Sequence, residues 1–173
     1  MMDSLDAIKE LREQTSCGVI DCKKALQEAD GNLEKAKEIL RQRGLEIAAK
    51  KGSREAREGR IEAYVHPGSK VAVLVEVNCE TDFVARNEDF CAFTKDLSMH
   101  IAAMSPEYIT EDEVPQEVLD AQENKQAYIK EKILVNQAFV KDTSKTIQDK
   151  LNELIAKIGE NIRIGRFTRY KVG

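Results

Sequence analysis

The sequence predicts an α+β protein, in which an N-terminal module of three helices precedes a core of a three-stranded antiparallel sheet covered by helices. Apolar residues recur at a spacing of three and four in several segments, which indicates amphipathic helices, and they alternate with polar residues in others, which indicates strands. With 173 residues, 42% of them hydrophobic, the chain can bury one ordinary core with a small module attached. We expect a three-helix module over residues 1–44, a charged linker over 45–59 and the α+β core over 60–173.

Three helical patterns fill the N-terminal module. We expect Asp3 or Ser4 to cap the first helix and residues 30–32 to form a turn and cap before the third, which should end at Gly44. The apolar positions of the three patterns are Leu5, Ile8 and Leu11; Val19, Cys22, Ala25, Leu26 and Ala29; and Leu33, Ala36, Ile39 and Leu40. Most of these side chains are small, so the helices can approach closely and form a compact module.

A basic segment follows the module. Lys50, Lys51, Arg54, Arg57 and Arg60 outnumber the glutamates around them. We interpret this segment as a solvated linker, because runs of charge are usually hydrated; docking against an acidic partner is the alternative.

The core begins with a β-hairpin. Ile61, Ala63 and Val65 alternate with polar residues, and HPGSK provides a turn. Residues 71–77 form an almost continuous β-branched strand, which we expect to be buried on both faces. The last strand, NIRIGRFTRYKVG, should pair with the hairpin and contain a bulge at Gly165.

Helical patterns occupy the rest of the core. One runs from Phe90 to Met104, with Phe93, Leu97 and Ile101 between them, and ends at Pro106; another runs from Ile147 to Ile158 and stops at Gly159. Between them, residues 107–137 have a polar middle, and we expect a helix that is partly exposed or packs only through its ends. Because the central strand is so apolar, the second face of the sheet must be covered by helices of this chain or by the sheet of another copy.

Composition and motifs argue against several classes of function. The formal net charge is −4, so the composition does not call for a large nucleic-acid-binding surface. The longest apolar run is too short to cross a bilayer and the N-terminus lacks an export pattern, so we expect a cytoplasmic protein. We expect the four cysteines to be reduced and to hold no metal. Phosphate-loop, dinucleotide-binding, nucleophile-elbow and zinc-protease motifs are missing from the sequence, so we expect no cofactor and no enzyme activity.

The most distinctive stretch is VLVEVNCETDFVARNEDF, residues 73–90. It places Phe83 beside Asp82 in a polar turn after the central strand, while Phe90 and Phe93 define a different face of the next helix, so something outside that helix should cover Phe83. The stretch resembles the signature of the elongation factor Ts family, the guanine-nucleotide exchange factors for elongation factor Tu. Residues 11–44 resemble that family's ubiquitin-associated-like helical module, residues 48–59 its linker, and residues 139–151 and 158–170 the closing part of its core.

The resemblance implies a factor that promotes GDP release from elongation factor Tu during translation elongation by perturbing the magnesium and phosphate side of the nucleotide site. Asp82 and Phe83 would lie at the start of a helix, with the ring wedged into the nucleotide domain of Tu. Arg86 and Asn87 would orient this turn rather than contact Tu. The residues implied to form the partner-binding site are Thr81, Asp82, Phe83, Val84, Arg86 and Asn87 from this stretch, and Val19, Ile20, Asp21, Lys23, Lys24 and Leu26 from the second helix.

The implied partners are Tu, GDP-bound or nucleotide-free, and a second copy of this chain, with no membrane and no direct nucleic acid. The chain departs from the family in having SCGVI, residues 16–20, where Gly-Ala-Gly-Met-Met is usual; on composition, Val19 and Ile20 fit an internal core equally well. It also lacks room for the duplicated core and coiled-coil insertion of long members. It therefore resembles a short form with one core, which implies a homodimer that covers the second sheet face.

Two other functions stay open on the residues alone. An RNA-binding translation accessory protein would use the basic linker and the last strand, where Arg163, Arg166, Arg169 and Lys171 interleave with Phe167 and Tyr170. Such a pattern could track RNA and stack its bases, although arginines in an alternating strand normally cover its edge. A thiol-dependent enzyme would use Cys79 or Cys91, which we interpret as small core residues.

Overall fold

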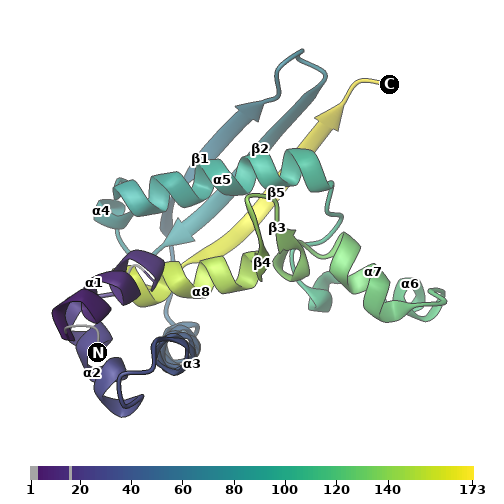
Figure 1. Cartoon of the computed structure of the whole chain (residues 1–173). Coiled ribbons are helices and arrows are strands. Elements are labelled where there is room, and N and C mark those ends of the chain that lie inside the picture. Colours follow the sequence, from purple (N-terminus) through teal and green to yellow (C-terminus); the bar gives the residue numbers. More distant parts are fainter. Residues whose placement is uncertain (1–3, 16) are drawn as a thin grey trace. The chain divides into compact units, whose positions relative to one another are not determined.

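The computed structural model describes residues 4–15 and 17–173 (Figure 1). The chain forms two compact units, which we call the helical unit (Met1–Arg54 with Asn152–Asn161) and the sheet unit (Glu55–Leu151 with Ile162–Gly173). Helices and an antiparallel sheet are both present, so the predicted α+β class is confirmed.

The helical unit contains the predicted three-helix module: α1 (Ser4–Thr15), α2 (Val19–Glu28) and α3 (Leu33–Lys51). Asn32 caps α3, because its side chain accepts a hydrogen bond from Lys35 N at 3.0 Å. The predicted cap at Asp3 or Ser4 lies outside the side chains that the structure describes. The buried core of the module consists of Leu11, Cys22, Ala25, Leu26, Ala29, Ala36 and Leu40.

The prediction that the third helix ends at Gly44 is wrong. α3 continues to Lys51, so the first half of the expected linker is helical. Gly44 is buried inside the helix, where glycine costs only about 1 kcal/mol relative to alanine, and the good helix formers after it continue the turn. Lys50 and Lys51 occupy the last turn of α3, where positive charge favours the helix C-terminus.

The sheet of the sheet unit contains three antiparallel strands in the order β1-β2-β5: β1 (Glu58–Val65), β2 (Val71–Cys79) and β5 (Arg163–Lys171). The hairpin and its pairing with the last strand are therefore confirmed. The bulge at Gly165 is also confirmed, since the register between β2 and β5 shifts there. A Cβ atom on Gly165 would lie 2.5 Å from Asn78 Oδ1, so this position has no room for a side chain without local movement.

One face of this sheet is buried. Helix α5 (Glu88–Met104) lies across it in Figure 1, and Val73, Val75 and Val77 of β2 point inward and are almost fully buried. The long apolar helix predicted from Phe90 is thereby confirmed.

The opposite face, which we call the outer face, is exposed, so the prediction that β2 is buried on both faces is wrong for the single chain. Strand register places its side chains together: Ile61, Ala63, Val65, Ala72, Leu74, Thr168 and Tyr170. The polar end of this face holds Glu76, which accepts hydrogen bonds from Asn78 Nδ2 and Arg166 Nε at 3.0 and 2.8 Å. These bonds lower the pKa of the Glu76 carboxyl.

Residues 107–137 form two short helices, α6 (Gln116–Asp120) and α7 (Lys125–Lys132), instead of one. Asn124 separates them because its side chain caps α7, accepting from Ala127 N at 3.0 Å. A hairpin of β3 (Ala138–Phe139) and β4 (Asp142–Thr146), which the sequence did not predict, precedes α8. The last predicted helix is confirmed as α8 (Ile147–Ile158), followed by Gly159 with a φ of 83°.

Candidate partner-binding site

The candidate site is a single helical turn that presents Asp82 and Phe83. This turn, α4 (Asp82–Ala85), begins directly after β2. Thr81 caps it: the backbone of Thr81 is extended, and its Oγ1 accepts a hydrogen bond from Val84 N at 3.4 Å. The thiol of Cys79, the last residue of β2, donates to Thr81 O at 3.1 Å. The turn is therefore anchored to the buried central strand.

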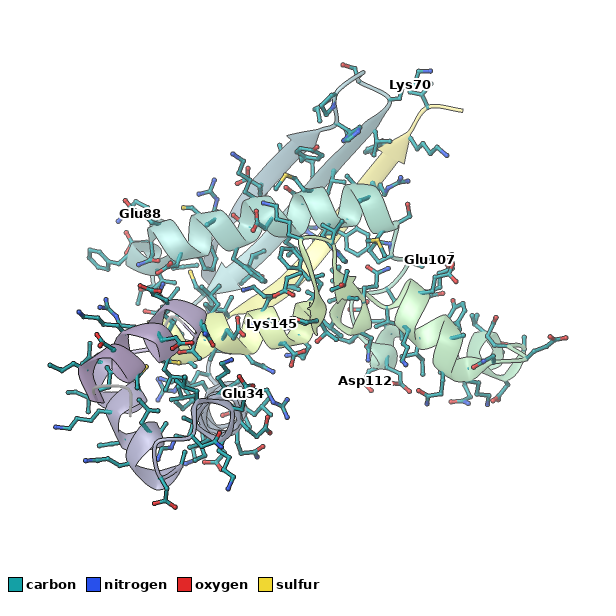
Figure 2. The ribbon with its side chains drawn as sticks, viewed as in Figure 1. Glu34, Lys70, Glu88, Glu107, Asp112 and Lys145 are labelled. Carbon is teal, nitrogen blue, oxygen red and sulfur yellow. The ribbon has the colours of Figure 1, made fainter. Side chains whose placement is uncertain are left out.

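The other end of the turn is anchored to α5. Asn87 caps α5, since its Oδ1 accepts hydrogen bonds from Asp89 N at 2.9 Å and from Phe90 N at 3.4 Å. Figure 2 labels Glu88, the first residue of α5, beside this junction. Because Phe90 is fully buried, the cap also fixes the start of α5 against the sheet.

Phe83 points away from the protein. Its side chain is 77% exposed, the largest exposed fraction among the exposed large hydrophobic residues in the described part of the chain. An exposed Phe83 cannot be a core residue of its own helix; Phe90, which is fully buried, fills that role. Exposed apolar side chains are common one at a time, but this ring stands on a turn that is capped at both ends.

Arg86 contacts both members of the Asp-Phe pair. Its Nη2 donates to Asp82 Oδ2 at 2.5 Å, and its Cζ lies 5.8 Å from the centroid of the Phe83 ring. An ion pair four residues apart and a cation over an aromatic ring are both favourable arrangements on a helix surface. The expected orienting role of Arg86 thus has a geometric basis, although both charged side chains are more than half exposed.

Two residues that the sequence analysis did not assign to the site, Cys91 and Arg60, connect the turn to α5 and β1. Cys91, in the first turn of α5, lies with its Sγ 3.7 Å from Ala85 O. Arg60 of β1 contacts that sulfur through Nη1 at 2.6 Å and pairs with Glu62 through Nη2 at 2.7 Å. Arg60 and Cys91 are 31 residues apart, and only the strand register and the packing of α5 bring them together, so no local pattern could have indicated this contact.

The second group of predicted site residues lies at the start of α2. Val19 and Ile20 are 51% and 69% exposed, which rules out the alternative that they form the module core. Asp21, Lys23 and Lys24 are also exposed. These five residues form what we call the α2 surface. Leu26, in contrast, is buried in the module core, so its expected place on the contact surface is wrong.

The α2 surface borders a cavity of about 700 Å³ in the helical unit, lined by residues of α1, α3 and the end of α8. Gly18, Val19 and Asp21 contribute to its rim, together with basic side chains such as Lys9 and Arg43.

Comparison with known proteins agrees with these features. The family model described as elongation factor TS matches residues 9–127. Proteins named elongation factor Ts from Caldanaerobacter subterraneus subsp. tengcongensis, Acetivibrio thermocellus and Herpetosiphon aurantiacus are 49%, 51% and 48% identical to this chain. The alignments cover 99%, 99% and 100% of this chain and 98%, 91% and 99% of the relatives. The chain belongs to the elongation factor Ts family. As its name states, this is a family of translation elongation factors, and the relatives named above match this chain almost from end to end.

In the described residues, no group of three or more histidine, cysteine, aspartate or glutamate side chains could hold a metal ion. None of the described helices is both long and apolar enough to cross a membrane. Of the four cysteines, Cys22 and Cys79 are buried and Cys17 and Cys91 are partly buried.

The last strand does not form the continuous basic and aromatic surface that the RNA alternative requires. Arg166 lies on the outer face paired with Glu76, whereas Arg169 points to the other side and donates to Ala102 O at 3.0 and 3.2 Å. Tyr170 shares the outer face with apolar residues. Arg166 and Arg169 thus bond to β2 and α5 on opposite faces of the sheet.

Proposed function

We propose that this chain is a guanine-nucleotide exchange factor that promotes GDP release from elongation factor Tu during translation elongation. The observation that carries the proposal is the 77% exposed ring of Phe83 on a turn anchored to both β2 and α5. The partner supplies the missing cover: the ring inserts into the nucleotide domain of Tu and perturbs the magnesium and phosphate side of the nucleotide site. Asp82, beside it, presents a carboxylate to the same region.

The size of the ring sets the size of the effect. Full burial of a phenylalanine side chain contributes roughly 1.5 to 3 kcal/mol, and each 1.4 kcal/mol is about tenfold in an equilibrium constant. Insertion of this one ring therefore stabilises the complex with open Tu by roughly ten- to a hundredfold. A flexible loop would lose part of this gain in ordering the side chain, whereas a turn that Thr81 caps and that leads directly into the α5 cap at Asn87 loses less.

Exchange needs no covalent step. If the factor binds the nucleotide-free form of Tu more tightly than the GDP form, thermodynamic linkage requires it to weaken GDP binding by the same factor. The protein then acts by differential binding alone, and we propose that it catalyses no chemical reaction. Proton-transfer groups and bound cofactors have no part in this mechanism.

The α2 surface is proposed as a second contact with Tu. Val19 and Ile20 provide exposed apolar area, and Lys23 and Lys24 provide positive charge beside it. The apolar residues would contribute affinity, while the lysines would steer association with an acidic patch of the partner. Contact through both surfaces would make binding stronger than through either one.

The test of the proposal follows release of a fluorescent GDP analogue from Tu. Wild-type protein should accelerate release strongly, and Phe83→Ala should reduce the acceleration by roughly ten- to a hundredfold, because the ring supplies that share of the binding energy. Val140→Ala removes another exposed apolar side chain, 42% exposed in the β3–β4 hairpin, and should leave the rate unchanged. Equal rates for wild type and Phe83→Ala would refute the wedge.

A further inference from the structure

The side chain of Arg86 bonds to one of the two residues that the proposed function depends on and lies over the ring of the other. Its guanidinium donates to Asp82 Oδ2 at 2.5 Å and lies 5.8 Å from the centre of the Phe83 ring. Asp82 and Phe83 precede Arg86 by four and three residues, so one helical turn brings all three side chains to the same side. Arg86 is also the C-cap of α4, and its backbone N–H donates to Phe83 O at 3.3 Å. The base of the arginine is thus fixed relative to the ring.

We infer that Arg86 is a positioning residue that holds the Phe83 ring in its projecting orientation before the partner arrives, with its own guanidinium fixed by the ion pair to Asp82. The inference rests on the proposed function and deepens it. An exposed aromatic ring without a neighbour samples several rotamers, and selecting one of them on binding lowers affinity by roughly two- to tenfold. A guanidinium that lies against the ring and is tied to the neighbouring carboxylate restricts this sampling in the free protein.

The same geometry predicts that loss of the Arg86 side chain has little effect on the stability of the fold. The side chains of Arg86 and Asp82 are 69% and 51% exposed, and exposed ion pairs contribute little to global stability. α4 is held instead by the Thr81 cap and by the contacts of Cys91 and Arg60 beneath it. Loss of the Arg86 side chain should therefore change the orientation of Phe83 without changing the unfolding temperature of the protein.

The shape of the arginine matters as well as its charge. A guanidinium is planar and can lie on an aromatic ring while one edge donates to a carboxylate, whereas an ammonium group is compact and more strongly hydrated. Arg86→Lys should keep most of the ion pair with Asp82 and lose part of the ring contact. Its effect should fall between those of wild type and Arg86→Ala.

A first experiment measures the ring in the free protein. Nuclear magnetic resonance couplings and relaxation of a labelled Phe83 side chain should show one dominant χ1 rotamer in wild type and rotamer averaging in Arg86→Ala. This readout needs no partner, so it tests the inference even if the proposed function fails. A ring that is equally averaged, or equally ordered, in both proteins would overturn the inference.

A second experiment measures GDP release from Tu at limiting factor concentration. Arg86→Ala should slow release roughly three- to fivefold, the size expected for one exposed cation–ring contact and one helical ion pair. Arg41→Ala is the matched control, because Arg41 also forms an exposed ion pair within a helix, with Glu38, and it should keep the wild-type rate. Both variants should unfold at the wild-type temperature. An Arg86→Ala protein with the wild-type rate would overturn the inference.

The double variant separates positioning from direct contact. If Arg86 acts through the ring, Arg86→Ala should have no further effect on the rate in the Phe83→Ala background, because coupled residues are not additive. A further three- to fivefold loss in that background, roughly the effect of the single change, would mean that Arg86 acts independently of the ring and would overturn the positioning role. An unchanged rate for Phe83→Ala alone would instead refute the proposed function, and the measurement on the free ring would still decide the role of Arg86.

Discussion

His100 is a buried titratable side chain of the sheet unit, and its hydrogen bonds define its protonation state. Val140 N–H donates to Nδ1 at 3.2 Å, so this nitrogen is the acceptor, and Nε2 donates to Gln137 Oε1 at 2.9 Å. The amide of Gln137 is held in turn, since its Nε2 donates to Glu131 O at 2.5 Å. In the neutral ring both nitrogens of His100 are therefore hydrogen-bonded. A second proton, on Nδ1, would point at the Val140 N–H, which is itself a donor.

This arrangement predicts a pH dependence of stability. Burial lowers the pKa of His100 from its ordinary value of 6.5, and the hydrogen bond to Gln137 opposes this shift less strongly. Below pH 6.5 the unfolded chain binds a proton that the folded chain does not, so the free energy of unfolding falls as pH drops toward the lowered pKa of the folded state. The stability from this source is complete above pH 6.5.

Urea unfolding of wild type from about pH 7.5 to about pH 5.5, above the range in which most carboxylates titrate, should show this decline. His100→Leu should be less stable at every pH, because Gln137 and Val140 lose their partner, but its stability should be nearly constant over this range. His66→Leu, at an exposed site, should keep the wild-type decline. Parallel curves for wild type and His100→Leu would contradict the assignment.

At the scale of elements, the junction between α4 and α5 depends on the Asn87 cap. Replacing an N-cap asparagine by alanine costs about 1 kcal/mol, whereas aspartate caps equally well. Asn87→Ala should therefore lower the free energy of unfolding by about 1 kcal/mol, and Asn87→Asp should have little effect. Because Asn87 also sets where α4 ends and α5 begins, Asn87→Ala should slow GDP release from Tu as well.

Asn32→Ala provides the matched control for this prediction. Asn32 caps α3 with the same kind of bond, from Lys35 N at 3.0 Å, but it belongs to the helical unit, whereas the Phe83 turn belongs to the sheet unit. It should lose comparable stability in urea unfolding and keep its rate of GDP release. Equal slowing by both variants would mean that stability alone, and not the geometry of the junction, explains the loss.

Elements with a strong periodic pattern could be predicted from the sequence, and those that depend on contacts between distant residues could not. The Phe90 helix, the Ile147 helix and the bulge at Gly165 follow from local spacing. The end of α3 could not be placed at Lys51, because a glycine is a stop signal in most contexts but is tolerated inside a helix whose neighbours continue it.

The candidate site shows the same division. The exposure of Phe83 was predictable from its place between polar residues, and its caps are recognisable side-chain types. The burial of Leu26 could not be predicted, since α2 could have turned either face outward. The support of α4 by Arg60 and Cys91 could not be predicted either, because that contact joins β1 to α5. The sequence therefore identified Phe83 as the exposed ring, while tertiary packing determined which residues support the α4 turn.

At the scale of the whole molecule, the outer face of the sheet is the largest feature without an explanation inside one chain. Ile61, Val65, Leu74 and Tyr170 are 64%, 61%, 49% and 67% exposed on adjacent strands, and charge is confined to the end at Glu76 and Arg166. Exposed apolar patches of this kind are characteristic of interfaces. A second copy is the occupant that we propose, as in the homodimer implied for short family members, because a two-fold axis would place two identical apolar faces together with the polar ends at the rim.

A charge at the centre of this face should separate the copies. Leu74 lies on the central strand, so Leu74→Lys would bury two unpaired ammonium groups in the dimer while leaving them hydrated in the monomer. Light scattering should give twice the mass of one chain for wild type at micromolar concentration and the mass of one chain for Leu74→Lys, with unchanged circular dichroism. Val140→Lys, at an exposed apolar site of the β3–β4 hairpin, should remain dimeric. If two copies form each exchange-competent unit, Leu74→Lys should also lose GDP release activity. A wild-type protein that is monomeric at the concentration where it is fully active would show that the outer face is covered by something other than a second copy.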